Sequence, residues 1–260
     1  MTEVGVGAEG GASSIRVAVI GAYGRMGSLA CATVSETQGL DLVARIGRGD
    51  DLALAEGADT VIDLSVGERG VEHATWAIEH AKHVVVATSG LGAGDIATIR
   101  ARWAETASSV GVLIVPNFSL GALLARRFAS MAAPHFEEVE IVEGAPPQKA
   151  DAPSGTAIEL AEALAAQDGG APGARLEADT FEEAARGARF GSVAVHSVRI
   201  RGMVNHQEVL LGRDGEVLSI RFDTLDRAAY MPGVVASLRK VSSMPGVHVG
   251  LEAVYGEILR

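Results

Sequence analysis

The sequence has little cysteine, no long apolar stretch and fewer basic than acidic residues, and each of these excludes a class of protein. It contains one cysteine, Cys31, in 260 residues, so no disulfide can form within the chain, and a reducing cytoplasm is the expected compartment. No stretch approaches the roughly 18 consecutive apolar residues of a membrane helix. Basic residues are outnumbered by acidic ones, 22 to 33, and the formal net charge of -11 argues against a nucleic-acid surface.

The remaining composition is that of a soluble globular protein, with 48% hydrophobic and 21% charged residues. Residues 1–14 are rich in Gly, Ala, Ser and Glu and have neither a basic start nor an apolar run, so we expect a flexible tail and not a secretion signal. Cys31 falls in the first helix expected after this tail, where a buried structural thiol is the natural interpretation.

Residues 15–116 alternate between short apolar runs and helical stretches. Continuous Val and Ile runs separated by helices indicate strands that are covered on both faces. This pattern predicts an α/β domain built on a doubly wound, Rossmann-like parallel sheet. The expected strands lie at 16–20, 40–46, 60–64, 83–87 and 111–115, and the expected helices at 26–36, 70–80 and 95–106.

The character of the sequence changes after Pro116. Residues 117–228 predict an α+β domain on a mixed or antiparallel sheet, in which Gly212–Gly215 is the turn of a hairpin. Residues 229–260 form a C-terminal segment whose helix, at 232–241, is expected to return to the first domain. The expected elements of the second domain are helices at 121–133 and 158–166, strands at 138–143, 193–201, 208–211 and 217–222, and flexible residues at 168–174.

A glycine-rich loop follows the first expected strand and opens the first helix. It reads Gly21-Ala22-Tyr23-Gly24-Arg25-Met26-Gly27. Glycines allow the backbone to turn tightly and approach a diphosphate, and the following helix start offers free amide donors. Because the loop lies between a strand and a helix and four more strands follow, we expect it to bind a dinucleotide.

The end of the second expected strand bears on the choice between NADPH and NADH. An acid there would bind the ribose 2′-hydroxyl, whereas an arginine would accommodate a 2′-phosphate. This strand ends with Arg45 and Arg48 before the first acid, Asp50. We therefore expect NADPH to be preferred over NADH, with Arg45 and Arg25 in the nucleotide pocket; the alternative is that these arginines are solvated surface charges.

A second segment, Lys149 to Ala157, precedes an apolar-periodic helix. Ser154, Gly155 and Thr156 can form an anion cradle at the helix start, and Lys149 adds a mobile positive charge that suits a substrate carboxylate. An ordinary helix cap beside a solvated lysine explains the pattern equally well.

The sequence resembles a known family, the 4-hydroxy-tetrahydrodipicolinate (dihydrodipicolinate) reductases of bacterial lysine synthesis. The resemblance runs from Ile15 to about Val254, and Lys149–Ala157 is its most specific part. It is carried by the runs Val19–Gly27, Val61–Asp63, Ala87–Gly90, Pro116–Gly121, Lys149–Ala157, Val195–Arg199, His206–Val209 and Met231–Val234.

The resemblance implies roles for these residues. The loop Gly21–Gly27 would hold the diphosphate, and Lys149, as a catalytic residue, would grip a substrate carboxylate together with Ser154, Gly155 and Thr156. The surroundings of the nicotinamide and its ribose would be Ala87, Thr88, Asn117 and Phe118. Members of the family are typically homotetramers assembled through the second-domain sheet.

One departure from the family pattern concerns the proton donor. The family has Glu-Leu-His-His followed by two residues and the lysine, and the first histidine is its proposed general acid. This chain reads Glu143-Gly144-Ala145-Pro146-Pro147-Gln148-Lys149. Ala145 and Pro146 have no side-chain proton to donate.

Three interpretations follow from this departure. The first, which we favour slightly, is that the chain reduces a different small cyclic imine or enamine that carries a carboxylate. The second is that it is the lysine-pathway reductase with Lys149, water or another group as the proton source; His206 is a candidate, although a histidine within a strand is more often a structural hydrogen-bonding residue. The third is that it is a nucleotide-binding scaffold without activity. The retained glycine loop and carboxylate cradle argue against the scaffold.

Other polar residues suggest no further site. His73 and His80 lie seven apart on one expected helix face without a third ligand, so no metal site is expected. Asp63 and Asp151 are interpreted as hydrogen-bond acceptors that orient loops.

Overall fold

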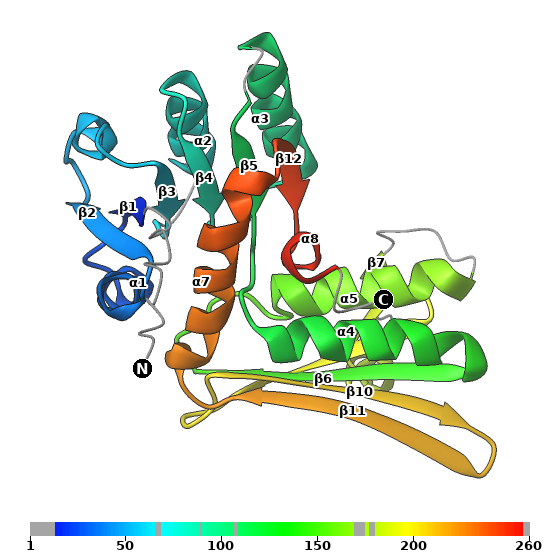
Figure 1. Ribbon diagram of the computed structural model, residues 1–260. Coiled ribbons are helices and arrows are strands. Elements are labelled where there is room, and N and C mark those ends of the chain that lie inside the picture. Colours follow the sequence, from blue (N-terminus) through cyan, green and yellow to red (C-terminus); the bar gives the residue numbers. More distant parts are fainter. Residues whose placement is uncertain are drawn as a thin grey trace, which may run out of the picture. The chain divides into compact units, whose positions relative to one another are not determined.

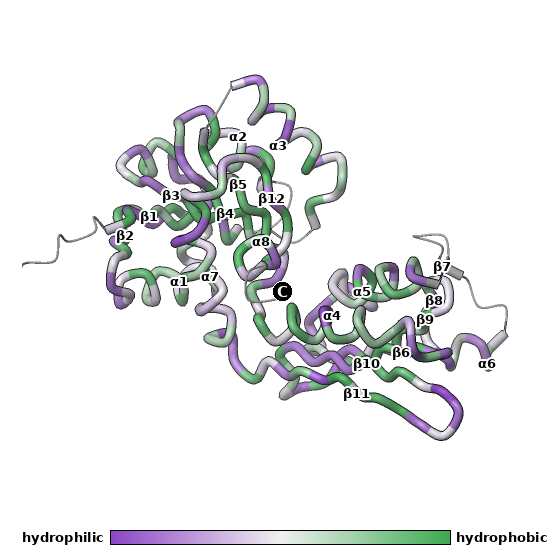
Figure 2. Tube along the Cα trace, turned by 45° about the vertical axis from the view of Figure 1, so that its right-hand side comes forward, coloured by the Kyte–Doolittle hydropathy of each residue, from purple (hydrophilic) through white to green (hydrophobic). Residues whose placement is uncertain are grey.

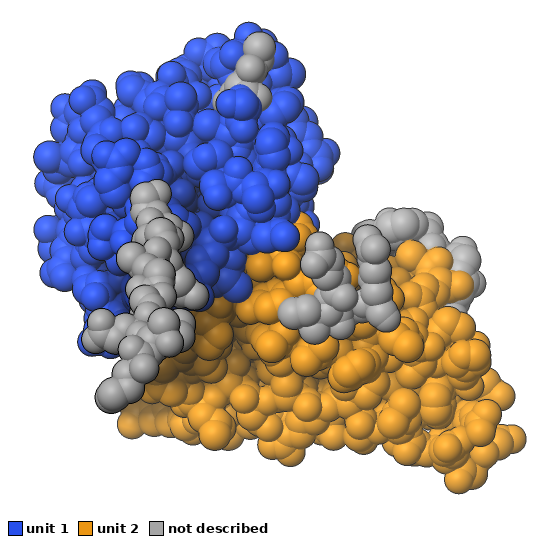
Figure 3. Space-filling view, viewed as in Figure 1, with its two compact units in different colours: residues 1–116, 235–249 blue, residues 117–234, 250–260 orange. Residues whose placement is uncertain are grey.

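The computed structural model describes residues 14–65, 69–88, 90–106, 109–168, 175–176 and 180–256. Apart from Ser14, the expected tail lies outside these ranges, as do residues 169–174 and Ser89. The chain divides into two compact units, 1–116 with 235–249 and 117–234 with 250–260 (Figure 3). The C-terminal segment 229–260 is therefore shared between the two units.

The first unit contains a six-stranded parallel sheet in the order β12-β5-β4-β3-β1-β2 (Figure 1). Each pair of neighbouring strands runs parallel, so the carboxyl ends of all six strands lie at the same edge of the sheet. The strands are β1 (Ile15–Ile20), β2 (Leu40–Ile46), β3 (Thr60–Asp63), β4 (His83–Val86), β5 (Gly111–Ile114) and β12 (Gly246–Val249).

The burial of these strands follows from their sequence. Every residue of β3 and β5 is buried, as expected of Val/Ile runs covered on both faces, whereas the edge strand β2 alternates between exposed residues and buried or half-buried ones. The central strands form an apolar band in Figure 2. The helices are α1 (Arg25–Glu36), α2 (Arg69–Glu79), α3 (Ala93–Glu105) and α7 (Met231–Lys240), with 3₁₀ turns at Leu52–Ala55 and Val241–Ser243.

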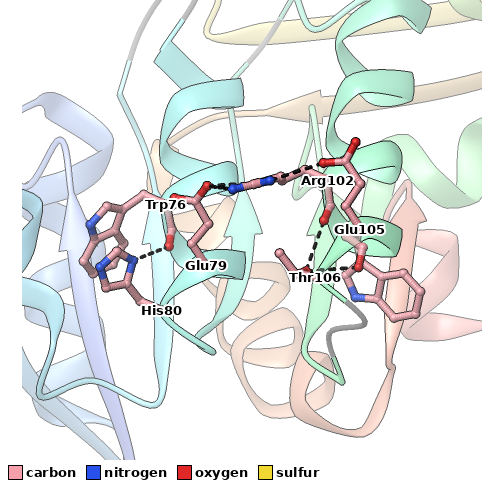
Figure 4. Close-up of polar contacts among 7 residues, drawn as sticks. Trp76, Glu79, His80, Arg102, Glu105 and Thr106 are labelled. Carbon is pink, nitrogen blue, oxygen red and sulfur yellow. Dashed lines mark hydrogen bonds and ion pairs between the residues drawn. The ribbon is translucent and has the colours of Figure 1, made fainter.

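Helices α2 and α3 pack on one face of this sheet and are tied together at their outer surface. Arg102 of α3 is paired with Glu79 of α2 and, at 3.2 Å, with Glu105 (Figure 4). On the other side of α2, the rings of Trp76 and His80 stack with their centroids 4.2 Å apart. Of these contacts, the Arg102–Glu79 pair joins the two helices, whereas Trp76 is half-buried against the apolar core of the unit.

The second unit contains a mixed six-stranded sheet in the order β11-β10-β6-β9-β8-β7. The β6–β9 pair is parallel and the other pairs are antiparallel. Alternate residues of β6, β9 and β10 pack with α4 and α5 into one apolar core. The strands are β6 (Glu138–Ala145), β7 (Arg175–Leu176), β8 (Ala188–Phe190), β9 (Val193–Arg199), β10 (Asn205–Arg213) and β11 (Glu216–Thr224); the helices are α4 (Leu120–Ala132), α5 (Gly155–Ala165), α6 (Phe181–Ala184) and α8 (Glu252–Tyr255), with 3₁₀ turns at Ala133–His135, Ala166–Asp168 and Arg227–Tyr230.

The predicted fold class, a Rossmann-like parallel sheet with a second mixed-sheet domain, is confirmed. Three short strands, β7, β8 and β12, were not expected from the sequence. Cys31 is buried and free, as expected, and burial raises the pKa of its thiol. None of the described helices is both long enough and apolar enough to cross a membrane.

Candidate functional site

The glycine loop is packed so tightly that side chains are excluded from two of its three glycine positions. Gly21 has a positive φ of 76°, and a Cβ there would lie 2.7 Å from the Leu64 carbonyl carbon. A Cβ on Gly27 would lie 2.0 Å from the Gly21 oxygen. Gly24 is less confined, with a closest approach of 3.3 Å. The loop backbone is therefore pressed against the end of β3 and against the first turn of α1.

The start of α1 presents unpaired backbone donors. Gly24 is its N-cap and supplies no side-chain acceptor, so the first amides of the helix, beginning at Arg25, have no capping partner from that residue. Tyr23, Gly24 and Arg25 are exposed, and Met26 is half-buried. Free amides together with the positive end of the helix dipole suit a diphosphate, so the loop fits the expected dinucleotide.

The end of β2 lies against the glycine loop. A Cβ on Gly47 would meet the Tyr23 ring at 2.7 Å, so this exposed ring occupies the place of a side chain at position 47. The Asp50 carboxylate turns back to accept a hydrogen bond from the Gly47 amide at 2.7 Å. Arg45 is exposed on β2 and close enough to Cys31 to lower the pKa of its thiol in part.

The ends of β3 and β4 are joined by a buried carboxylate. Asp63, which is fully buried, accepts hydrogen bonds from the Ser65 amide at 2.9 Å and from the Thr88 hydroxyl at 3.0 Å. His73 Nδ1 of α2 lies 3.2 Å from Asp63 Oδ2. Burial raises the pKa of Asp63, but hydrogen bonds from His73 and Ser65 outweigh this effect and hold the pKa below its ordinary value. Asp63 therefore orients loops, as the sequence indicated.

The expected nicotinamide residues divide between the two units. Ala87 is half-buried and donates its amide to the Asp63 carbonyl oxygen, and Thr88 is buried beside it. Asn117 and Phe118 belong to the second unit. The Asn117 side chain accepts from the Ser119 amide at 2.9 Å, and Phe118 is buried against Gly233.

The Lys149 segment forms a second cluster, in the second unit. Lys149 Nζ lies 2.8 Å from Asp151 Oδ2, and both side chains are partly exposed. Burial raises the pKa of Asp151, but the hydrogen bond from Lys149 outweighs it and the pKa is lowered. Ser154 is the N-cap of α5; its hydroxyl accepts from the Ala157 amide and lies 3.3 Å from the Thr156 hydroxyl.

Ala145 is the last residue of β6, which lies between β9 and β10. Its register partner on β9 is Arg199, which pairs with buried Glu143 at 2.7 Å and donates to the Asp151 carbonyl oxygen. His206 is paired in register with Gly144, so its side chain lies on the opposite sheet face from that of Ala145. His206 Nδ1 contacts Asp223 at 2.8 Å, which favours the structural role over the catalytic one.

Two polar residues were missed as parts of the site. The hydrogen bond from the Gly47 amide to the Asp50 carboxylate depends on a turn in which Gly49 has a positive φ of 90°. In the sequence, the glycine at position 49 is the local signal for this turn. The sequence pattern suggests for His73 only a comparison with metal ligands, yet the residue falls in the stripe of α2 that contains the buried residues Gly70, Ala74 and Ala77. A histidine within an apolar helix stripe needs a buried partner. Among the described residues, no group of three His, Cys, Asp or Glu side chains could hold a metal ion.

Comparisons with known proteins agree over both units. A family model described as dihydrodipicolinate reductase, N-terminus, matches residues 15–118, and one described as dihydrodipicolinate reductase, C-terminus, matches residues 121–254. A 4-hydroxy-tetrahydrodipicolinate reductase from Streptomyces coelicolor is 45% identical over 244 residues, covering 92% of this chain and 97% of the relative. One from Beutenbergia cavernae is 43% identical and covers 92% of this chain and 98% of the relative.

A solved structure shows the same architecture. The dipicolinate-bound dihydrodipicolinate reductase from Paenisporosarcina sp. TG-14 has a TM-score of 0.78 and 28% identity, covering 92% of this chain and 99% of that one. The two family models together span both sheets, and the glycine loop at α1 fits a dinucleotide. The chain therefore belongs to the dihydrodipicolinate reductase family and is an NAD(P)H-dependent oxidoreductase.

Proposed function

We propose that this chain reduces a small cyclic imine that carries a carboxylate. The first substrate to test is 4-hydroxy-tetrahydrodipicolinate, the compound that appears in the names of its relatives. The observation that carries the proposal is the ammonium group of Lys149, paired with Asp151 at 2.8 Å, together with the capped start of α5 at Ser154, five residues further along the chain. A mobile cation and helix amides together suit a carboxylate.

The reduced nicotinamide supplies the hydride when it is bound. The residues of this chain hold and orient the reactants: backbone amides at Gly24–Gly27 would bind the diphosphate, and Thr88, fixed by Asp63, would lie beside the nicotinamide ribose. By the family resemblance, Ala87, Asn117 and Phe118 would complete these surroundings. Lys149, Ser154, Gly155 and Thr156 would hold the substrate carboxylate.

Lys149 is not free before the substrate arrives, because Asp151 neutralises it at 2.8 Å. A substrate carboxylate would replace Asp151 as the partner of the ammonium group. Asp151 is partly exposed, so it can be solvated once released, and the exchange costs little. This exchange would couple substrate binding to a movement of the Lys149–Asp151 segment.

A second candidate function follows from Ala145. The position that the resemblance equates with the general acid is buried and aliphatic, and the guanidinium beside it, Arg199, does not release a proton. An imine that arrives already protonated, as an iminium ion, needs no acid from the enzyme. This observation favours a different cyclic imine of higher basicity, still bound through its carboxylate.

The decisive assay follows NADPH oxidation with freshly generated 4-hydroxy-tetrahydrodipicolinate. If it is the substrate, turnover is robust, and Lys149→Met raises its KM by at least about tenfold because a charge-assisted contact is lost. Lys240→Met, which removes another lysine, is the matched control and leaves KM unchanged.

Other outcomes separate the candidates. Weak turnover that rises more than about tenfold in Ala145→His would favour the second candidate, since a positioned general acid typically contributes at least 10²-fold. Tight NADPH binding without turnover by either protein would exclude the compound as substrate. Failure to bind either dinucleotide would overturn the proposal as a whole and favour a scaffold.

We infer a preference for NADPH from the charges at the end of β2. Arg45 and Arg48 are both exposed there, while the Asp50 carboxylate is engaged by the Gly47 amide. Arg45→Ala is expected to lower kcat/KM for NADPH several-fold and to leave that for NADH unchanged. Equal losses with both dinucleotides would contradict a contact with the 2′-phosphate.

We also propose a homotetramer in the reducing cytoplasm. Helices α4 and α5 lie on one face of the second sheet (Figure 1), and the strand residues that alternate with its core, such as Val142, Leu210 and Val217, lie on the other face. Val217 is 69% exposed in the single chain. Light scattering of the purified protein tests the assembly, and a monomer at micromolar concentration would exclude it.

A further inference from the structure

The most polar buried cluster of the first unit lies where β3 and β4 end. Asp63, His73 and Thr88 are 0%, 1% and 2% exposed. The Asp63 carboxylate is their common partner, at 3.2 Å from His73 and 3.0 Å from the Thr88 hydroxyl. One side chain therefore connects the last residue of β3, the helix α2 and the residue that lies two positions beyond β4.

The cluster is costly for the fold in isolation. A buried carboxylate loses its hydration, and hydrogen bonds must replace it, so well-packed apolar residues would often be at least as stable. The preceding residues of the same strand, Val61 and Ile62, are apolar and fully buried. Stability alone therefore does not account for a carboxylate and an imidazole at this place.

The cluster also supports the glycine loop. Asp63 fixes the Ser65 amide at 2.9 Å, and the Ser65 nitrogen lies 2.8 Å from the point that a Cβ on Gly21 would occupy. Thr88 in turn packs on Gly70 of α2, where a Cβ would lie 3.1 Å from the Thr88 Cβ. The backbone beside the diphosphate loop and the end of β4 are thus positioned by one carboxylate.

The position in the sheet indicates which half of the dinucleotide this cluster would affect. Strand β1, with the glycine loop, lies between β2 on one side and β3 and β4 on the other. In such sheets the adenosine ribose lies at the end of β2, so the nicotinamide half extends toward β3 and β4. Asp63, Ser65 and Thr88 are all at that second side.

We propose that Asp63 and His73 are positioning residues that set the affinity for the nicotinamide half of the dinucleotide, acting through Thr88 and the Ser65 backbone. The inference rests on the proposed dinucleotide binding. His73 holds the carboxylate in place from α2, and the carboxylate holds the Thr88 hydroxyl and the Ser65 amide. Neither Asp63 nor His73 needs to touch the dinucleotide.

The test compares two ligands that differ in the nicotinamide half. NADPH contains both halves, whereas adenosine 2′,5′-bisphosphate contains only the adenosine side. In calorimetric titrations, His73→Leu is expected to weaken NADPH about tenfold, the effect of losing one charge-assisted hydrogen bond, and to change the affinity for the bisphosphate less than twofold. Thr88→Val is expected to show the same selective loss.

Two further variants separate positioning from general damage. His73→Asn retains a side-chain donor near the place of Nδ1 and should restore NADPH affinity to within about threefold of the unaltered protein. His83→Leu removes a half-buried histidine at the amino end of β4, where its ring accepts a hydrogen bond from the Gly111 amide. The affinities for NADPH and for the bisphosphate should both remain unchanged. Thermal melting establishes that each variant is folded.

Equal weakening of both ligands in His73→Leu and Thr88→Val, or no weakening of either, would overturn the inference. Failure of His73→Asn to recover more affinity than His73→Leu would also contradict it. If the unaltered protein binds neither ligand, the proposed function itself fails, and this result is distinct from the others because it needs no variant. A rise in the KM for NADPH without a fall in kcat is the matching kinetic result.

Discussion

At the scale of single residues, the three loop glycines meet different neighbours and are not equivalent. A methyl group on Gly27 would collide with the backbone at 2.0 Å, and one on Gly21 would meet Leu64 in an unfavourable backbone conformation. A methyl group on Gly24 would find its nearest atom at 3.3 Å. The tolerance of the loop to alanine should therefore rise from Gly27 and Gly21 to Gly24.

Gly27→Ala is expected to abolish NADPH binding, because the first turn of α1 must move away from the Gly21 carbonyl to make room for a methyl group. Gly24→Ala should weaken binding less. Gly57→Ala, where a Cβ meets nothing within 4 Å, is the control and should bind normally. Fluorescence titration with NADPH measures the order, and retention of affinity in Gly27→Ala would refute the packing argument.

The buried carboxylate at Asp63 predicts a dependence of stability on pH. Its pKa in the folded protein is lowered relative to the unfolded chain, where it is about 3.9. The stabilisation it provides is therefore complete above that unfolded value and is lost as the pH falls through the folded pKa. We expect Asp63→Asn to lower the free energy of unfolding at pH 7 by about 1–3 kcal/mol and by less at pH 3.5.

Urea unfolding at the two pH values measures this difference. Asp41→Asn, at an exposed position of β2, is the matched carboxylate and should change stability little at either pH. A penalty for Asp63→Asn that is the same at pH 3.5 and pH 7 would show that the carboxylate charge does not contribute.

The parts of the site that are built from residues adjacent in the sequence could be predicted from the sequence. The glycine loop and the Ser154 cap depend on neighbours within a few positions, and these local patterns are visible in the sequence. The contacts of His73 with Asp63 and of Tyr23 with Gly47 join residues 10 and 24 positions apart across separate elements. Such contacts are determined by how the elements pack on the sheet, and no local sequence pattern predicts them.

At the scale of elements, long periodic segments were predictable and short ones were not. The buried strands β3, β4 and β5 and their helices match the expected ranges within a few residues. Strand β12 has four residues, directly follows Pro245, and depends on pairing with β5 and on packing against the first unit's apolar core, which lie far away in the sequence. Helix α5 begins at Gly155 and not at residue 158, because Ser154 caps it before the apolar periodicity starts.

Two serine caps in the second unit permit a matched comparison. Ser119 caps α4 and Ser154 caps α5, each accepting from the amide three residues later. Both Ser→Ala changes should cost about 0.5–2 kcal/mol of stability. Only Ser154→Ala should also raise the KM for the carboxylate substrate, because only that helix start is proposed to bind it. An equal effect on KM from both would show that the caps act through stability alone.

At the scale of the whole molecule, the first sheet is completed by a late part of the chain. Residues 235–249 supply most of α7 and the edge strand β12 to the unit that begins the sequence. Gly111 of β5 is packed so closely that a Cβ there would lie 1.9 Å from the Val241 oxygen. The first unit is thus a discontinuous domain.

A fragment that spans residues 14–116 is therefore expected not to fold cooperatively, because β5 becomes an unpaired apolar edge. Joining residues 230–249 to it through a flexible linker should restore a sharp thermal transition and NADPH binding. Circular dichroism and titration test both proteins. A shorter fragment that melts cooperatively alone would show that β12 and α7 are dispensable.

The late arrival of β12 has a consequence for synthesis on the ribosome. Translation proceeds from the amino terminus, so β5 has emerged long before residues 246–249 exist, and more than a hundred residues of the second unit are made in between. During that interval the nascent first unit has an open hydrogen-bonding edge. That edge is closed only when residues 246–249 have been made and pair with β5.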